Sequence, residues 1–139
     1  MGDGIFVIND NGYWRAFVTN STNESITRLD FGNSLLNTPT AVDLGNPNGQ
    51  LYNPRDIIII KFCGETVGFV VNANSDELIK LDFTNGLDKV PTATNLGNMG
   101  DLNVPHSLSK LFRVGSDLFS FITNVGNNSI TRLQFSGCN

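Results

Sequence analysis

The chain has 139 residues, of which 40% are hydrophobic and 16% charged, and its formal net charge is −4 at pH 7. Disordered polyelectrolytes and coiled coils are rich in charge, and a membrane helix needs about 18 consecutive apolar residues, so this composition excludes those classes. The acidic balance also argues against a nucleic-acid surface, which needs clustered Lys and Arg. The longest apolar run, Ile57–Ile60, has four residues, so we expect no membrane insertion.

The N-terminus and the cysteines limit the class of protein further. Met1–Ile5 has no basic region followed by a cleavable apolar region, so we expect no export signal in this chain. Cys63 and Cys138 are too few for a disulfide scaffold or a four-ligand zinc site, and we interpret both as ordinary thiols.

An internal repeat with a spacing of 52 residues organises the chain. Three sets of segments align at or near this spacing: Phe17–Asn20 with Phe69–Asn72 and Phe121–Asn124; Ile26–Phe31 with Leu78–Phe83 and Ile130–Phe135; and Pro39–Asn46 with Pro91–Asn98. We therefore interpret residues 1–139 as a single repeat domain, with units of approximately 4–50, 51–101 and 102–139.

Each unit is expected to form four short strands. The first is an apolar run, predicted at Ile5–Ile8, Ile57–Ile60 and Leu108–Phe112. The second carries the Phe-Val or Phe-Ile motif and follows a turn marked by Asn11-Gly12, Cys63-Gly64 or Gly115-Ser116. The third alternates, with Leu29 and Phe31 on one face, and the fourth follows Pro39 or Pro91.

A four-stranded unit of about 50 residues is typical of a β-propeller blade. One twisted sheet cannot bury both of its faces, so blades stack face to face around an axis. We therefore expect six phenylalanines to be core residues between blades: Phe17, Phe31, Phe69, Phe83, Phe121 and Phe135.

The count of strands is four, four and three, because no third Pro-Thr-Ala strand follows Phe135. Propellers close with about four to eight blades, so just under three cannot close a ring. An open stack would leave two apolar faces in water. Two alternatives follow: a homodimer that completes a six-bladed ring, which we favour, or a chain that is part of a longer polypeptide.

The repeat also resembles a known type. The unit from Phe17 to Asn46 is similar to the Asn-rich tandem propeller repeats of large secreted bacterial surface proteins, and Leu-x-x-Pro before an Ile-rich strand is distantly similar to NHL-type repeats. The resemblance implies a six-bladed type of propeller, an extracellular or cell-surface location, and a binding or scaffolding role.

Few residues of this sequence are candidates for metal binding, catalysis or ligand contact. His106 is the only histidine, so a multi-histidine metal site within one chain is excluded. Arg55 and Asp56 lie at the entry to an inner strand, where propellers place ligand-contacting groups; the alternative is a solvated surface pair. His106 starts the corresponding strand of the third unit, and its alternative role is a loop histidine bound to backbone.

The repeated Asn20, Asn72 and Asn124 end the second strands and would make a set of equivalent ligand-binding sites; alternatively, each caps a turn. The repeated Arg28, Lys80 and Arg132 are interpreted as members of charge pairs on the blade. Trp14, at the first hairpin, is the most ligand-like aromatic residue, together with Tyr13 and Tyr52.

Three functions compete for this sequence. We favour a non-catalytic binding or scaffold propeller that presents loops to protein or carbohydrate partners and needs no cofactor. The second candidate is an NHL-like or lactonase-like enzyme with a metal in the channel. Such a site needs several carboxylates and histidines, and the sequence offers only Asp3, Asp56 and His106. The third is an architectural repeat of a larger adhesin.

Overall fold

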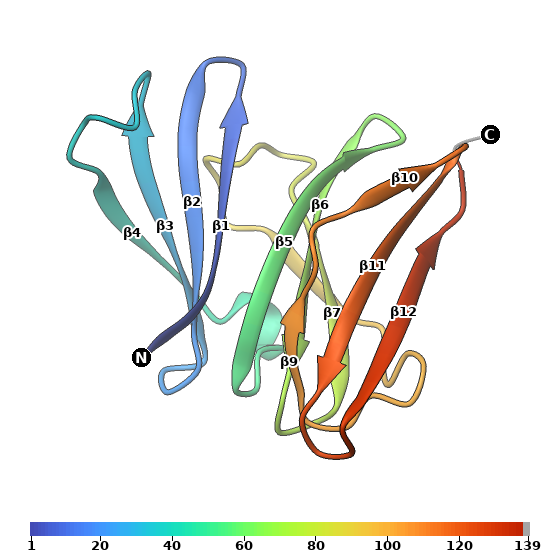
Figure 1. Cartoon of the computed structure of the whole chain (residues 1–139). Coiled ribbons are helices and arrows are strands. Elements are labelled where there is room, and N and C mark those ends of the chain that lie inside the picture. The colour runs from blue at the N-terminus through green and yellow to red at the C-terminus, as the bar shows by residue number, and fades with distance from the viewer. Residues whose placement is uncertain (138–139) are drawn as a thin grey trace.

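The structure is a computed structural model that describes residues 1–137, and these residues form three antiparallel sheets (Figure 1). The first sheet contains β1 (Gly2–Asp10), β2 (Tyr13–Asn20), β3 (Ser25–Gly32) and β4 (Thr40–Gly45), in that order. The second contains β5 (Pro54–Phe62), β6 (Glu65–Asn72), β7 (Glu77–Asp82) and β8 (Thr92–Asn95). The third contains β9 (Pro105–Leu108), β10 (Phe112–Val114), β11 (Asp117–Asn124) and β12 (Ser129–Phe135). The all-β prediction is confirmed.

The predicted hairpin turns are present between the first two strands of the first and second sheets. Asn11 and Gly12 have φ of 52° and 87°, and Cys63 and Gly64 have φ of 55° and 77°. Two successive residues with positive φ make the turn whose twist matches that of an antiparallel pair, and Asn and Gly adopt it readily. The local sequence therefore sets the register of these hairpins.

The first strand of the third sheet departs from the prediction. A continuous strand at Leu108–Phe112 is wrong, because the chain forms β9 up to Leu108 and resumes as β10 at Phe112, and both pair with β11. The break is held by Ser109, whose N–H donates to the carbonyl of Phe121 at 2.8 Å and whose hydroxyl accepts from the N–H of Phe121 at 2.9 Å. Ser109 lies opposite Phe121, as Ile58 lies opposite Phe69 in the second sheet, so the apolar run is interrupted here.

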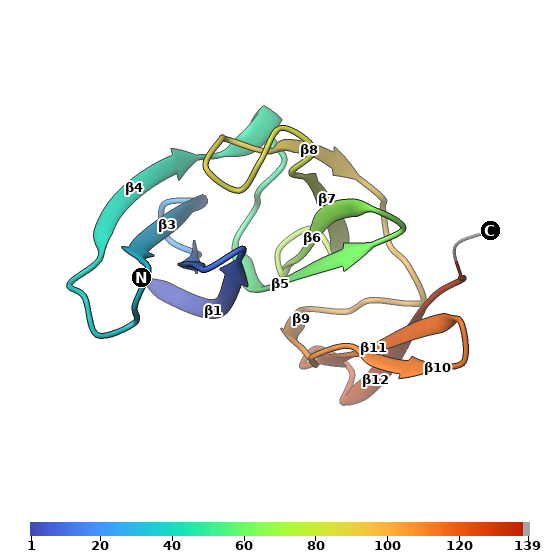
Figure 2. The same ribbon diagram turned by 90° about the horizontal axis from the view of Figure 1, so that it is seen from above.

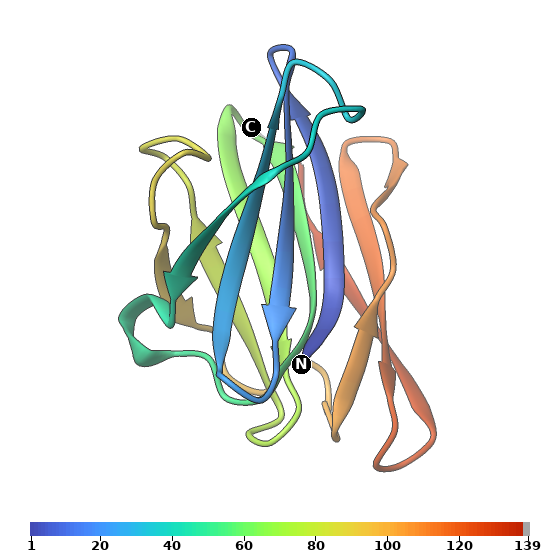
Figure 3. The same cartoon turned by 90° about the vertical axis from the view of Figure 1, so that its left-hand side faces the viewer.

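The sheets are arranged as an arc with the first strands on the inside. Seen from above, β1, β5 and β9 lie toward the inner side of this arc, and β4 and β8 lie on its outer side (Figure 2). The strands of the three sheets run along a common direction, with connections gathered at both ends (Figure 3). The helical part within residues 1–137 is a short 3₁₀ turn, Pro47–Gly49, and no helix there is long and apolar enough to cross a membrane.

Two apolar layers hold neighbouring sheets together. Between the first and second sheets, Phe17 packs edge-on against Phe83 with ring centroids 5.3 Å apart. Between the second and third, Phe69 packs against Phe135 at 4.7 Å. Phe17, Phe69 and Phe83 are buried, as predicted, because each lies between two sheets.

The prediction that Phe121 is a core residue is wrong for the single chain. Its side chain is 40% exposed, because it lies on the outer face of the third sheet, where no further sheet covers it. Phe31 and Phe135 are half-buried. Position within the arc therefore decides burial, since Phe17 and Phe69 occupy the same place in their own sheets.

Both ends of the arc carry apolar side chains in water. We call the outer surface of the first sheet around Ile5, Val7 and Phe31 the N-terminal face, where Ile5 is 59% exposed. We call the outer surface of the third sheet around Phe112, Phe121 and Ile130 the C-terminal face, where Ile130 is 70% exposed. The residues that correspond to Ile130 in the other sheets, Ile26 and Leu78, are almost wholly buried.

The thiol interpretation is wrong for Cys63, which is disulfide-bonded. Cys138 lies outside the described residues.

Gly4 allows the inner strands of the first two sheets to approach closely. A Cβ at this position would lie 2.6 Å from Cα of Asp56 and 2.8 Å from the carbonyl oxygen of Arg55, both of them backbone atoms. We expect Gly4→Ala to lower the free energy of unfolding by about 1–3 kcal/mol, because the sheets must separate to admit the methyl group.

Chemical denaturation measures this effect, and Gly2→Ala is the matched control. A Cβ at Gly2 would meet Cγ1 of Val18 at 3.1 Å, a side-chain atom that can move. Equal stability of the two variants would contradict the close approach.

Candidate functional site

Three corresponding connections gather at one end of the molecule. Residues 21–24, 73–76 and 125–128 join β2 to β3, β6 to β7 and β11 to β12, and all three lie at the same end in two perpendicular views (Figures 1 and 3). Glu24, Asp76 and Asn128 close these connections with φ of 51°, 54° and 56°. We call this region the loop end. Its backbone repeats while its side chains differ.

The three repeated asparagines start these connections, but their amides are used within the fold. Asn72 is fully buried, accepts from the N–H of Tyr52 at 3.1 Å and donates to the carbonyl of Gln50 at 2.8 Å. Asn124 accepts from the N–H of Asn103 at 3.1 Å. Asn20 donates to the hydroxyl of Thr27 at 3.0 Å. The amides of Asn72 and Asn124 therefore tie the inter-sheet connections to the ends of β6 and β11.

We expect Asn72→Ala to lower the free energy of unfolding by about 1–3 kcal/mol, because it leaves the backbone groups of Gln50 and Tyr52 without their partner. Thermal or denaturant unfolding measures the change. Asn23→Ala, at an exposed site of the loop end, is the control and is expected to change stability by less than about 0.5 kcal/mol. An Asn72→Ala protein as stable as the control would contradict the anchoring role.

Arg55, Asp56 and His106 lie at the starts of the inner strands at the loop end, since Pro54 pairs with Asn72 and Pro105 with Asn124. The Asp56 carboxylate accepts from the N–H of Leu108 at 2.7 Å and from that of Ile57 at 2.9 Å, so it joins β5 to β9. Burial raises the pKa of Asp56 above its ordinary value, while these two backbone donors and the charge of His106 oppose that shift. His106 is exposed, with Nδ1 3.4 Å from the hydroxyl of Ser107.

Arg55 contacts the first sheet. Its Nη1 lies 2.9 Å from Oδ1 of Asp3, and its carbonyl accepts from the hydroxyl of Thr19 at 3.2 Å. Burial acts to raise the pKa of Asp3, but hydrogen bonds from Ser21 and Arg55 and the charge of Arg55 outweigh it and hold that pKa below its ordinary value. Arg55 and Asp56 thus bridge sheets on either side of β5, and the two side chains engage different neighbours.

Trp14 is not brought near these residues. It pairs with Asn9 beside the Asn11-Gly12 turn, at the end of the first sheet opposite to the loop end. Tyr13, on the same hairpin, is 52% exposed, with the guanidinium of Arg15 5.2 Å from its ring centroid. The sequence-predicted candidates therefore divide between the two ends of the molecule.

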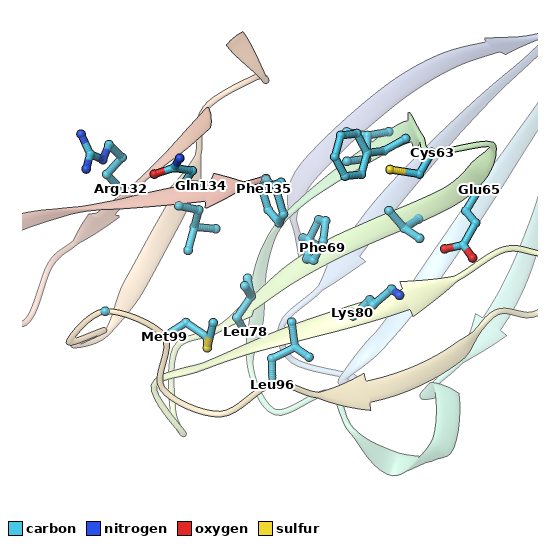
Figure 4. Close-up of a pocket in the computed structure, with 15 residues that line it drawn as sticks. Cys63, Glu65, Phe69, Leu78, Lys80, Leu96, Met99, Arg132, Gln134 and Phe135 are labelled. Atoms are coloured by element: carbon cyan, nitrogen blue, oxygen red, sulfur yellow. The ribbon is translucent and has the colours of Figure 1, made fainter. Parts of the chain in front are cut away.

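A cavity that the sequence did not indicate lies between the second and third sheets (Figure 4). Its volume is about 540 Å³. Phe69 and Leu78 of the second sheet and Phe135 of β12 line its apolar wall, and Lys80 and Glu65 are charged residues of its lining. None of the seven sequence-predicted site residues lines it. The repeated Arg28, Lys80 and Arg132 were the available signal, although they pointed only to charge pairs.

A second repeated feature, a pair of hydrogen bonds between an asparagine amide and the backbone, was also not predicted from the sequence. The amide of Asn46 both donates to the carbonyl of Leu51 at 2.9 Å and accepts from its N–H at 2.8 Å. The amide of Asn98 does the same with Leu102 at 2.9 and 2.7 Å. The asparagines of the Leu-Gly-Asn segments at the ends of the fourth strands therefore fix the backbone of the connection to the next sheet.

Among residues 1–137, no group of three or more His, Cys, Asp or Glu side chains is placed to hold a metal ion. No protein-family model matches the chain, and no curated protein matches it. The loop end thus combines a repeated backbone with side chains that differ from one connection to the next.

Proposed function

We propose that the protein is a non-catalytic binding or scaffold β-propeller whose loop end presents variable loops to protein or glycan partners. The observation that carries this proposal is the common backbone of the three connections, each of which differs in sequence and begins at an asparagine whose amide is hydrogen-bonded within the fold. Binding residues are commonly found on loops that a rigid scaffold positions. The resemblance to surface-protein propeller repeats supports the same role.

Glycan-array and pull-down binding of the whole chain test this function. A variant with Thr22, Asn23 and Asn74 all replaced by serine or alanine changes exposed loop-end residues. Ser116→Ala, on the β10–β11 turn at the opposite end, is the matched control. Binding that the loop-end variant loses and the control retains supports the proposal; binding that survives in both variants overturns it.

We also propose that two copies complete a six-bladed ring, with the C-terminal face of each copy against the N-terminal face of the other. Contiguous apolar patches beyond a few hundred Å² are rare on monomers, and this chain carries two apolar sheet faces. Because each face is covered by the other kind, the contact closes after two steps and leaves no face exposed.

The internal contacts specify how the faces would pair. Phe17 contacts Phe83, and Phe69 contacts Phe135, so each pair joins positions 66 residues apart in neighbouring sheets. Continuing the same pairing around the ring places Phe121 against Phe31 of a second copy. Arg28 likewise donates to the carbonyl of Leu87, which places Arg132 against the carbonyl of Leu35 in the second copy.

An extracellular or cell-surface location completes the proposal. It is supported by the resemblance to secreted repeats and by the disulfide at Cys63, since disulfides persist in oxidising compartments.

A further inference from the structure

The third strands of the three sheets have different surroundings. β3 pairs with β4, and β7 pairs with β8, whereas β12 pairs within the described residues with β11 alone. An unpaired strand edge presents a row of free N–H and C=O groups that can pair with another strand. The outer edge of β12 is therefore an acceptor for one more strand.

The second sheet shows which backbone N–H and C=O groups of β12 are available to an added strand. The N–H of Leu78 donates to the carbonyl of Gly97 at 3.0 Å, and its carbonyl accepts from the N–H of Leu96 at 2.9 Å, both beyond β7 on the side of β8. Ile130 corresponds to Leu78 in the repeat and is 70% exposed. Since alternate residues of a strand face the same neighbour, the backbone groups of Ile130, Arg132 and Gln134 face the open edge.

The cavity lies beside this edge. Leu133 and Phe135 of β12 form one wall, and Leu78 with the segment from Leu96 to Gly100 forms the other (Figure 4). Between the first two sheets, Leu87 from the β7–β8 connection is buried, and its carbonyl accepts a hydrogen bond from Nη1 of Arg28 at 3.3 Å. An added strand at β12 would bring its side chains over Leu133 and into the cavity.

We propose that the β12 edge and this cavity form a binding site for an extended peptide that adds antiparallel to β12. The two fourth strands show its chemistry, because β4 and β8 share the pattern Pro-Thr-Ala-x-x-Leu-Gly-Asn. In both, an alanine pairs with the leucine of the third strand: Ala41 with Leu29, and Ala93 with Leu81. The ligand therefore carries a small residue opposite Leu133, threonine or β-branched neighbours, and a leucine three positions after the small residue.

Continuity of the sheet favours the same ligand. The added strand would continue the existing ladder of β10, β11 and β12 rather than start a new contact. Main-chain pairing supplies affinity in this mode of recognition, and pockets for alternate side chains supply specificity.

A labelled peptide with the sequence of residues 37–46 tests the site by fluorescence anisotropy against the whole chain. We expect saturable binding of one peptide per chain, with slower amide hydrogen exchange at Ile130, Arg132 and Gln134. A peptide with Val42→Pro is expected to bind at least about tenfold more weakly, because Val42 pairs with Arg28 and proline cannot donate to the ladder.

Two protein variants separate backbone pairing from side-chain effects. Gln134→Pro removes an N–H on the open edge, where proline is tolerated, and is expected to weaken peptide binding about tenfold or more. Gln134→Ala keeps that N–H and is expected to bind the peptide like the parent chain. Absence of saturable binding, or protection confined to another strand, overturns the site. Sedimentation of the same samples distinguishes this outcome from a failure of ring closure, because the β12 edge is separate from the two faces that would pair.

Discussion

Phe121→Glu is expected to convert a two-chain assembly into single chains while leaving each chain folded. Phe121 is 40% exposed in the single chain and contacts Phe112 at a centroid distance of 6.4 Å on the C-terminal face. A glutamate there costs little in water, but against the N-terminal face of a second copy it would be a buried, unpaired charge. We expect self-association at least about thirtyfold weaker, since central aromatic residues of an interface contribute about 2 kcal/mol or more.

Size-exclusion chromatography with light scattering measures the assembly, and circular dichroism shows whether the chain remains folded. Tyr52→Glu is the matched control, because Tyr52 is 51% exposed but belongs to the connection before β5 and not to either open face. An assembly unchanged by Phe121→Glu would contradict the proposed pairing of faces.

Phe17→Ala is expected to have the largest effect on the stability of the single chain, lowering the free energy of unfolding by about 3–5 kcal/mol. Phe17 is fully buried between the first and second sheets, and its ring packs against Phe83. Removing it leaves a cavity in the layer that also contains Ile57, Val70 and Ile79. The two sheets cannot move together to fill this cavity, because their other strands hold them in place.

The midpoint of unfolding in urea checks this value, with the dependence on urea concentration unchanged. Leu36→Ala is the control, because Leu36 is 97% exposed and its loss is expected to change stability by less than about 0.5 kcal/mol. A Phe17→Ala chain as stable as the control would mean that the two sheets do not pack as the structure has them.

Much of the fold was predictable because the same strand and turn pattern occurs in three repeat units. Apolar runs such as Ile57–Ile60 and turns such as Asn11-Gly12 are local signals, and both formed the expected strands and hairpins. Burial was predictable where a residue lies between two sheets, as Phe17 and Phe69 do. It was not predictable for Phe121, because the repeat specifies a face but not whether a neighbour covers it.

The candidate site was less predictable, because its features depend on contacts between sheets. Asp56 accepts from Leu108, which lies in another repeat unit, and that contact follows from the stacking of sheets rather than from a motif. The repeated Asn72 gave a signal that fits a ligand-binding residue and a structural anchor equally well, and burial of the side chain gives it the anchoring contacts. The cavity lies beside β12, which pairs with β11 alone within residues 1–137, and no residue pattern in the sequence indicates it.

Sedimentation equilibrium of the unmodified chain tests most directly whether the N-terminal and C-terminal faces cover each other in a second copy. The chain mass is 15.1 kDa, so two chains give about 30 kDa, and we expect this mass at micromolar concentration without larger species. A stably folded species at the mass of one chain, with both apolar faces left in water, would contradict ring closure by self-association.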